Sequence, residues 1–467
     1  MTWLKLSLGM LSALYGLFAI LRFPLVLPVV IVSYLTTVYV LGHSPRINVG
    51  TISIYGWDIL FLMAIASIPY RLIIQRQVIE PSARFAILFL ILYVAYLEFS
   101  EFYYFLFSGS KSLENFIRLS IKGCYPLVAL SMYLDLTRAK SNHFWKFVLF
   151  CVAIMGVAAA IRTVTGQGFV TSSGTLRYIR IEAMLIMFFP LVVGLFAPNL
   201  SRIWRAGLIG LGLGIVVLSS ARSAFLGCIA IFGVYGIYLV KTKQLGKVIA
   251  SNAAIALLVG AFGIVTLVIS KPDIAENFFN RAQDTFDTEN RTSSDRLNKW
   301  TIALETAQEN PFGGTKLNLL PDYYGKRELE AFAGALDLMS AQSRLFSMGE
   351  ADSAPPHNIF VNMLSRNGLI AFILFSAILV NVARHVGQHA DIHGKFLIAG
   401  WFAGNMVLMQ FNNHTNYDAS LSLFISVFVF PLIYAVSHHS LELKKESKSA
   451  SVEISHVQSG QSLHPRI

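Results

Sequence analysis

Apolar segments of about 20 residues follow one another along almost the whole chain, separated by short polar connections. A segment of this length crosses the hydrocarbon core of a bilayer as a helix, because a helix satisfies its backbone amides internally. The segments lie at 5–21, 24–42, 57–75, 84–106, 115–136, 144–164, 178–197, 202–219, 222–240, 247–270, 358–384, 394–411 and 418–437. The sequence therefore predicts an all-α polytopic membrane protein with 12 or 13 transmembrane helices, since the first two segments form either a hairpin or one broken element.

Composition agrees with a membrane protein. Only 13% of the residues are charged, whereas soluble domains carry about a quarter. The net charge of +11 would suggest nucleic acid in a soluble protein, but the basic residues lie in connections between apolar segments, which argues against that partner. Cys124, Cys151 and Cys228 all lie inside apolar segments, so neither a disulfide framework nor a thiolate metal site is expected.

Lysine and arginine are distributed unevenly between alternate connections, and this bias sets the expected orientation. Cytoplasmic connections of membrane proteins carry the excess of basic residues. The connections expected to be cytoplasmic, together with the tail, contain Arg71, Arg76, Arg84, Arg138, Lys140, Lys146, Arg202, Arg205, Lys241, Lys243, Lys247, Arg384, Lys395, Lys444, Lys445 and Lys448. The alternate connections would lie on the opposite, outer side.

One outer connection differs from the others. Residues 271–356 form a polar loop of about 85 residues, where connections usually have only a few. We expect this loop to be a helical cap over the membrane domain. The domains would then be N-terminal transmembrane helices at 1–270, the loop, C-terminal transmembrane helices at 357–440, and a disordered cytoplasmic tail at 441–467.

The loop contains a helical pattern of its own. Ser294 or Asp295 can cap the start of a helix, and Asn310-Pro311 would end it. The side chains expected on its apolar face are Leu297, Trp300, Leu304 and Ala307.

Three arginines are candidate functional residues. Arg222 opens a predicted helix at its outer end, where a guanidinium either grips a phosphate in a bidentate way or caps the helix and snorkels. Arg291 and Arg296 lie in the loop, and Trp300 follows Arg296 by four residues. That spacing is equally consistent with a surface cation–π pair.

His357 and Asn358 stand where the loop re-enters the membrane, directly after two prolines. A neutral histidine can accept a proton from an attacking hydroxyl, and the neighbouring asparagine can orient the ring or the substrate. The alternative is that the two residues only cap the helix that starts at Ile359.

Arg118 and Lys122 are four residues apart on one face of the predicted helix 115–136. They would form a cationic stripe at membrane depth, which either binds an anionic lipid headgroup or neutralises neighbouring carboxylates; we favour the pairing. The candidate carboxylates are those of Glu98, Glu101 and Glu114.

The sequence offers no sign of a cofactor. No short outer connection carries paired carboxylates that would hold a divalent cation, and no phosphate-cradling P-loop is present. We therefore expect neither a metal nor another cofactor.

Together these motifs resemble the O-antigen ligase and polysaccharide polymerase superfamily. The likeness covers roughly residues 205–385 and rests on the order, spacing and topology of four motifs. These are Ser-Ser-Ala-Arg-Ser at 219–223, Arg296-Leu-Asn-Lys-Trp300, Asn310-Pro-Phe-Gly-Gly314, and His357-Asn358 followed after nine residues by Gly368.

The resemblance implies a metal-independent, inverting glycosyltransferase of the GT-C type in a bacterial inner membrane, with its active site facing the periplasm. Its donor would be a glycan on undecaprenyl pyrophosphate. His357 would be the general base, with Asn358 beside it, and Arg222 and Arg296, together with Arg291, would bind the pyrophosphate.

Several acceptors remain open. Another lipid-linked glycan would make the protein an O-antigen, capsule or exopolysaccharide polymerase, the reading we prefer, because nothing marks a docking domain for another acceptor. Lipid A-core would make it an O-antigen ligase, and a protein hydroxyl an O-oligosaccharyltransferase. Membrane lipids and a chain-length regulator are further candidate partners; nucleic acid is not.

The alternative of a different class is a transporter or flippase. Such proteins usually show two similar halves, which this asymmetric chain lacks.

Overall fold

The computed structural model describes most of the helical parts of the chain, and the structural account concerns these residues. They are 16–41, 46–49, 52–107, 116–117, 120–121, 123–165, 169–170, 176–177, 184–197, 200–219, 222–243, 300–301, 303–305, 307–308, 311, 358–389, 391–411 and 430–439.

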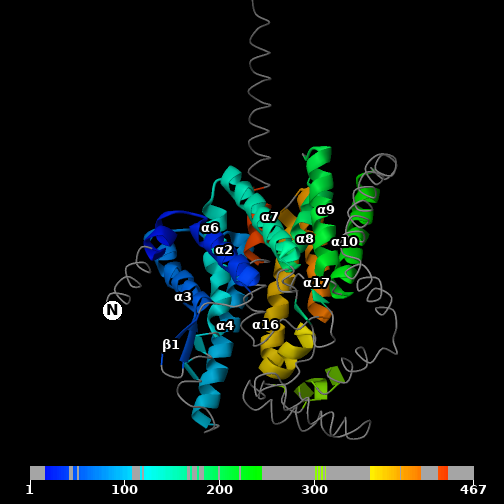
Figure 1. The fold of residues 1–467 in the computed structure, drawn as a ribbon. Helices are drawn as coiled ribbons and strands as arrows, with labels where there is room; N and C mark the ends of the chain where they lie inside the picture. The colour runs from blue at the N-terminus through cyan, green and yellow to red at the C-terminus, as the bar shows by residue number, and fades with distance from the viewer. Residues whose placement is uncertain are drawn as a thin grey trace, which may run out of the picture.

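Helices account for nearly all of these residues (Figure 1). Up to residue 164 the elements are a helical segment at 16–22, α2 (Val26–Leu41), β1 (Arg46–Val49), β2 (Ile52–Tyr55), α3 (Gly56–Pro69), the π-helix η1 (Tyr70–Ile74), α4 (Pro81–Phe107), the 3-10 turn η2 (Tyr125–Leu127), α6 (Val128–Arg138) and α7 (Ser141–Val164). The later elements are β3 (Phe169–Val170), β4 (Leu176–Arg177), α8 (Met184–Phe196), α9 (Arg202–Ser219), α10 (Arg222–Lys241), helical residues between 300 and 308, α16 (Ile359–His389), α17 (Ile392–Phe411) and a helical segment at 430–439.

The predicted fold class, an α-helical membrane protein, is confirmed. Most described helices coincide with predicted apolar segments to within a few residues. Four of them are long and apolar enough to cross a membrane, judged over the described residues, and their spans are Pro81–Tyr103, Ser141–Ala158, Ser223–Lys241 and Asn367–His385. The total number of spans, the segment 247–270, most of the loop 271–356 and the tail lie outside the described residues and remain predictions.

The sequence predicted an interruption between the first two apolar segments, and the break lies at 23–25, where Leu25 has a φ of 70°. Other local features differ from the prediction. The expected continuous helix 115–136 is interrupted by η2, because Pro126 has no N–H to donate to the helical ladder. Two short antiparallel hairpins, β1–β2 and β3–β4, occupy connections for which no strand was predicted.

The bundle has two chemically different ends. At one, which we call the basic end, lie the connections and helix termini that carry most of the described lysines and arginines, namely Arg76, Arg84, Arg138, Lys140, Lys146, Arg202, Arg205, Lys241, Lys243, Arg384 and Lys395. At the opposite, or hairpin, end lie β1–β2, the start of α10 and the start of α16 (Figure 1). The structure thus places the predicted cytoplasmic and outer residues at opposite ends.

Close helix packing depends on glycine on one side of the bundle, where α8, α9, α10 and α17 lie together (Figure 1). A Cβ on Gly212 of α9 would stand only 2.7 Å from Cβ of Leu191 in α8, and a Cβ on Gly227 of α10 would stand 3.0 Å from the carbonyl oxygen of Gly404 in α17. Apolar burial does little to drive helices together in lipid, so such close backbone approach supplies the packing. α16 connects this group to the other side of the bundle, since it contacts both α4 and α17.

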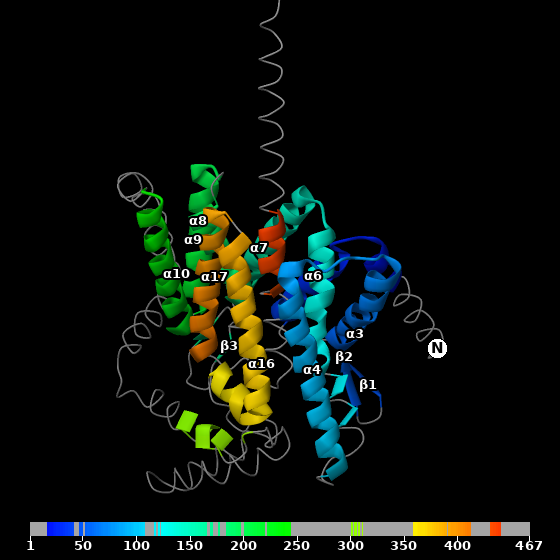
Figure 2. The same ribbon diagram turned by 180° about the vertical axis from the view of Figure 1, so that it is seen from behind.

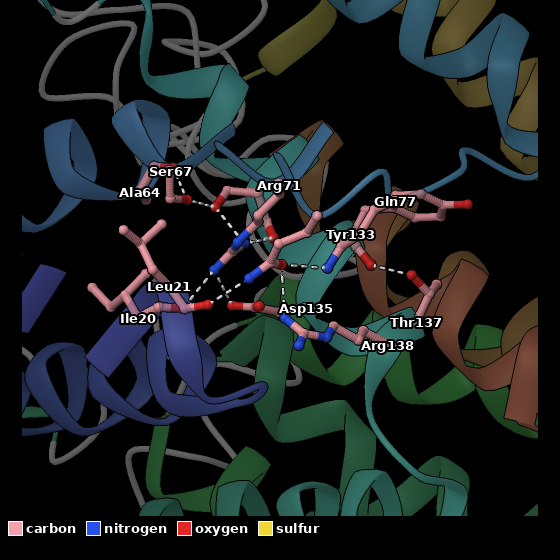
Figure 3. A network of polar contacts seen from close by, with 12 residues as sticks. Ile20, Leu21, Ala64, Ser67, Arg71, Gln77, Tyr133, Asp135, Thr137 and Arg138 are labelled. Carbon is pink, nitrogen blue, oxygen red and sulfur yellow. Dashed lines mark hydrogen bonds and ion pairs between the residues drawn. The ribbon is translucent and has the colours of Figure 1, made fainter. Parts of the chain in front are cut away.

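The other side of the bundle is held by a buried ion pair near the basic end (Figure 3). Arg71, in η1, is completely buried and lies 2.8 Å from the carboxylate of Asp135 in α6. The same guanidinium donates to the carbonyl oxygen of Ser131 at 2.7 Å and to that of Ile20 at 3.2 Å. One side chain therefore joins η1, α6 and the first helical segment.

This burial corrects the interpretation of Arg71. The sequence pattern assigned it to a basic cytoplasmic connection together with Arg76 and Arg84, both of which are exposed. Arg71 instead belongs to the bundle interior, because η1 continues α3 to Ile74, inside the apolar segment predicted at 57–75, and the Arg71 side chain is buried beside Asp135. The acidic partner that makes its burial tolerable, Asp135, lies 64 residues away.

We predict that Asp135→Ala destabilises the protein by about 3–5 kcal/mol, because it leaves the Arg71 guanidinium buried without a counter-charge. The double substitution Arg71→Met/Asp135→Leu should recover most of this loss, since neither charge then remains. Thermal unfolding in detergent measures both effects, and Arg84→Ala at an exposed position is the control. Equal losses in the single and double variants would contradict a charge effect.

Candidate functional site

The start of α16 is fixed by Asn358. Its side-chain Oδ1 accepts hydrogen bonds from the backbone N–H groups of Phe360 at 2.9 Å and Val361 at 3.2 Å, and the residue is buried. These bonds satisfy amides that the first turn of a helix leaves without partners. Asn358 therefore caps α16, as one of the two sequence alternatives proposed, and its catalytic role stays a prediction.

Ten residues further on, α16 is broken. Gly368 has φ 82° and ψ 177°, a backbone conformation that is essentially restricted to glycine. The residues before Gly368 form a short helix at the hairpin end, and those after it belong to the apolar span Asn367–His385. Ser365 and Asn367, just before the break, are buried polar residues.

Two other parts of the chain bond to the backbone at this break. The N–H of Leu369, which an unbroken helix would direct at Ser365, donates to the carbonyl oxygen of Pro311 at 2.7 Å. The hydroxyl of Tyr96 in α4 donates to the carbonyl oxygen of Asn367 at 3.1 Å. The proline of the Asn310-Pro311 motif thus bonds to the residue directly after Gly368.

The helix before Pro311 lies beside the lower end of α16 (Figure 2). Ala303 and Ala307 are buried, and Trp300 is partly buried, so the inward face follows positions 300, 303 and 307. The prediction of a helix here is confirmed for the described residues. The prediction that Leu304 belongs to its apolar face is wrong, because that side chain is 42% exposed.

Arg222 is the first residue of α10, as predicted, at the hairpin end where α16 also begins. The position of its backbone is therefore described, whereas its side chain lies outside the described part of the chain, as do Arg291, Arg296 and His357. Among the described residues that flank these four, a hydrogen bond joins Leu369 to Pro311. The roles of the four side chains remain predictions.

The segment of Arg118 and Lys122 lies against α4, but the two residues themselves are outside the description. The nearest described contact is between Cys124 Sγ and Glu98 Oε1, at 3.7 Å. Glu101, one turn further along α4, is buried. One predicted acidic partner thus lies beside this segment.

Among the residues that the structure describes, no group of three or more histidine, cysteine, aspartate or glutamate side chains is arranged to hold a metal ion.

Sequence reasoning missed the contribution of Tyr96. Nothing in the sequence distinguishes this tyrosine from other aromatic residues of α4, since its partner is a backbone carbonyl 271 positions away. The contact between Pro311 and Leu369 was also not anticipated, although both residues lie in or beside quoted motifs.

The helical architecture and the apolar helices long enough to cross a membrane define a polytopic membrane protein. Residues 207–376 match the family described as O-antigen ligase. The match includes the start of α10, Pro311 and Gly368, and it supports the assignment of the chain to the O-antigen ligase and polysaccharide polymerase superfamily. No curated protein matches the chain.

We predict that Gly368→Ala costs about 1–3 kcal/mol of stability, because a Cβ is strained at this φ and ψ. Gly387→Ala, in the same helix, is the matched control: a Cβ there meets nothing within 4 Å, and alanine favours helix. Unfolding in detergent should show a loss for the first variant and none for the second. Equal stabilities would mean that the break is not a constrained feature.

Proposed function

We propose that the protein is an inner-membrane glycosyltransferase that moves a glycan from undecaprenyl pyrophosphate to an acceptor hydroxyl on the periplasmic face. The observation that carries the proposal is the hydrogen bond between Leu369 and Pro311. It joins Pro311 to the residue after Gly368, both within the O-antigen ligase match, at the end of the bundle where α10 begins with Arg222. The match supports an O-antigen ligase or polymerase type of function in general.

The orientation follows from charge. If the basic end is cytoplasmic, as the excess of lysine and arginine favours, the break in α16 and the start of α10 face the periplasm. The loop 271–356 would then cover the site from the aqueous side. A lipid-linked donor presents its pyrophosphate at this membrane surface, within reach of residues at the hairpin end.

In the proposed reaction, an acceptor hydroxyl attacks the anomeric carbon of the donor sugar from the side opposite the pyrophosphate. The new C–O bond forms as the bond to the pyrophosphate oxygen breaks, and that oxygen keeps the electron pair. His357 takes the hydroxyl proton, and the configuration at the anomeric carbon inverts. Asn358, which caps α16, would hold the chain at His357 in place.

Negative charge that develops on the leaving pyrophosphate needs a fixed positive partner. Arg222 and Arg296, together with Arg291, would supply it, because guanidinium groups bind phosphate oxygens in a bidentate way. Donors that are fixed before the reaction stabilise such charge most in a site that excludes water. The sugar is already activated by its pyrophosphate, so the reaction requires neither ATP nor, on this proposal, a metal ion.

We propose a second lipid-linked glycan as the acceptor, which makes the protein a polymerase of O-antigen or exopolysaccharide. The description of the matched family favours a second candidate, ligation of the glycan to lipid A-core.

With either acceptor, Arg118 and Lys122 would bind an anionic headgroup or pair with acidic residues of α4. A chain-length regulator is a proposed partner of the polymerase alone.

The test of the proposed function uses purified protein and a lipid-linked glycan in detergent. Transfer predicts the release of undecaprenyl pyrophosphate together with a longer glycan, or with glycan attached to lipid A-core if the ligase is correct. His357→Ala should abolish release, because no group then accepts the proton, while His143→Ala at an exposed position of α7 should leave it unchanged.

Two results would count against this function. Full activity of the His357→Ala protein would remove the assignment of the base. Movement of the lipid-linked glycan across intact liposomes, with its chemistry unchanged, would instead indicate a carrier.

Metal chelation provides a separate prediction. Because arginines are proposed to neutralise the pyrophosphate, adding EDTA should change the transfer rate by less than about twofold, whereas losing an essential metal would cost several kcal/mol of transition-state stabilisation. A rate that disappears with EDTA and returns with Mg²⁺ would show that the arginines do not suffice.

A further inference from the structure

Trp300 has an indole N–H that is shielded from solvent but has no hydrogen-bond partner among the residues that the structure describes. Buried tryptophan N–H groups usually find a partner, and each exception requires an explanation. The side chain as a whole is only partly buried. Its N–H is thus a protected donor, and an incoming ligand is one group that can satisfy it.

The helix that carries Trp300 is held beside the break in α16. Trp300 shares its inward face with Ala303 and Ala307, which are buried at helical spacing. Pro311, just after this helix, accepts the hydrogen bond from Leu369. These contacts hold the end of this helix at the break in α16, at the end of the bundle where the proposed transfer takes place.

A missing partner alone does not identify a binding residue. Trp145, in the first turns of α7, also has a shielded Nε1 without a partner in the described part of the chain. It lies at the basic end, outside the family match, whereas Trp300 lies within the match and four residues after Arg296. Position therefore distinguishes the two indoles.

We infer that Trp300 Nε1 donates a hydrogen bond to an oxygen of the lipid-linked donor at its pyrophosphate–sugar end. The inference rests on the proposed function and adds to it a binding residue that the motif analysis did not assign. An indole can only donate, so its partner must be an acceptor. Phosphate oxygens and sugar hydroxyl oxygens share this chemistry, and affinity measurements distinguish them.

The sharpest test replaces Trp300 by 3-benzothienylalanine, which keeps the bicyclic ring and exchanges the N–H for sulfur. Affinity for the lipid-linked glycan should fall by about tenfold or more, the effect of losing a hydrogen bond to a charged or strongly polar group. The same replacement at Trp145 is the matched control and should leave affinity unchanged. Trp300→Phe should change affinity in the same direction.

Binding of undecaprenyl pyrophosphate without sugar is measured in parallel. Weaker binding of both ligands assigns a phosphate oxygen, and weaker binding of the glycosylated lipid alone assigns a sugar oxygen; either supports the inference. Unchanged binding of both ligands, with transfer by the unmodified protein intact, overturns it and leaves the proposed function standing. If the unmodified protein neither binds nor transfers the lipid-linked glycan, both proposals fail.

Discussion

An amide N–H that loses its helical acceptor in a bilayer has no water to replace it, so any break in a spanning helix must be satisfied by the rest of the protein. At Gly368 this is done by Pro311, which accepts the N–H of Leu369, and by Tyr96, which donates to the carbonyl oxygen of Asn367. The break in α16 therefore depends on hydrogen bonds to Pro311, which follows the helix that carries Trp300, and to Tyr96 in α4. This dependence brings Pro311 of the Asn310-Pro311 motif to the break at Gly368.

The rest of the bundle provides a frame for that break. Glycine at positions such as 212 and 227 lets α8, α9, α10 and α17 approach closely, while Arg71 and Asp135 join the elements on the other side. α16 lies between and contacts both sides. Its basic-end half is thus packed between the two sides, and its interruption occurs at the hairpin end, where the proposed reaction takes place.

The sequence predicted most of what depends on local periodicity. Apolar length placed α4, α9 and α10 to within a few residues, and Arg222 begins its helix as expected. What could not be predicted depends on distant partners: Arg71 looks like a connection residue until Asp135 is known to lie beside it. Leu304 was misassigned because helical spacing allows either i+3 or i+4 on the inner face, and tertiary packing selected Ala303. The convergence of Arg222, Arg296 and His357 remains a prediction.

The most direct test of this account is an experimental structure with bound undecaprenyl pyrophosphate. We expect its phosphates between the start of α10 and the break in α16, contacted by the guanidinium groups of Arg222 and Arg296, with His357 facing the sugar position. Phosphates bound at the basic end would contradict the central claim. So would an Arg222 side chain too far from His357 for both residues to contact one bound donor.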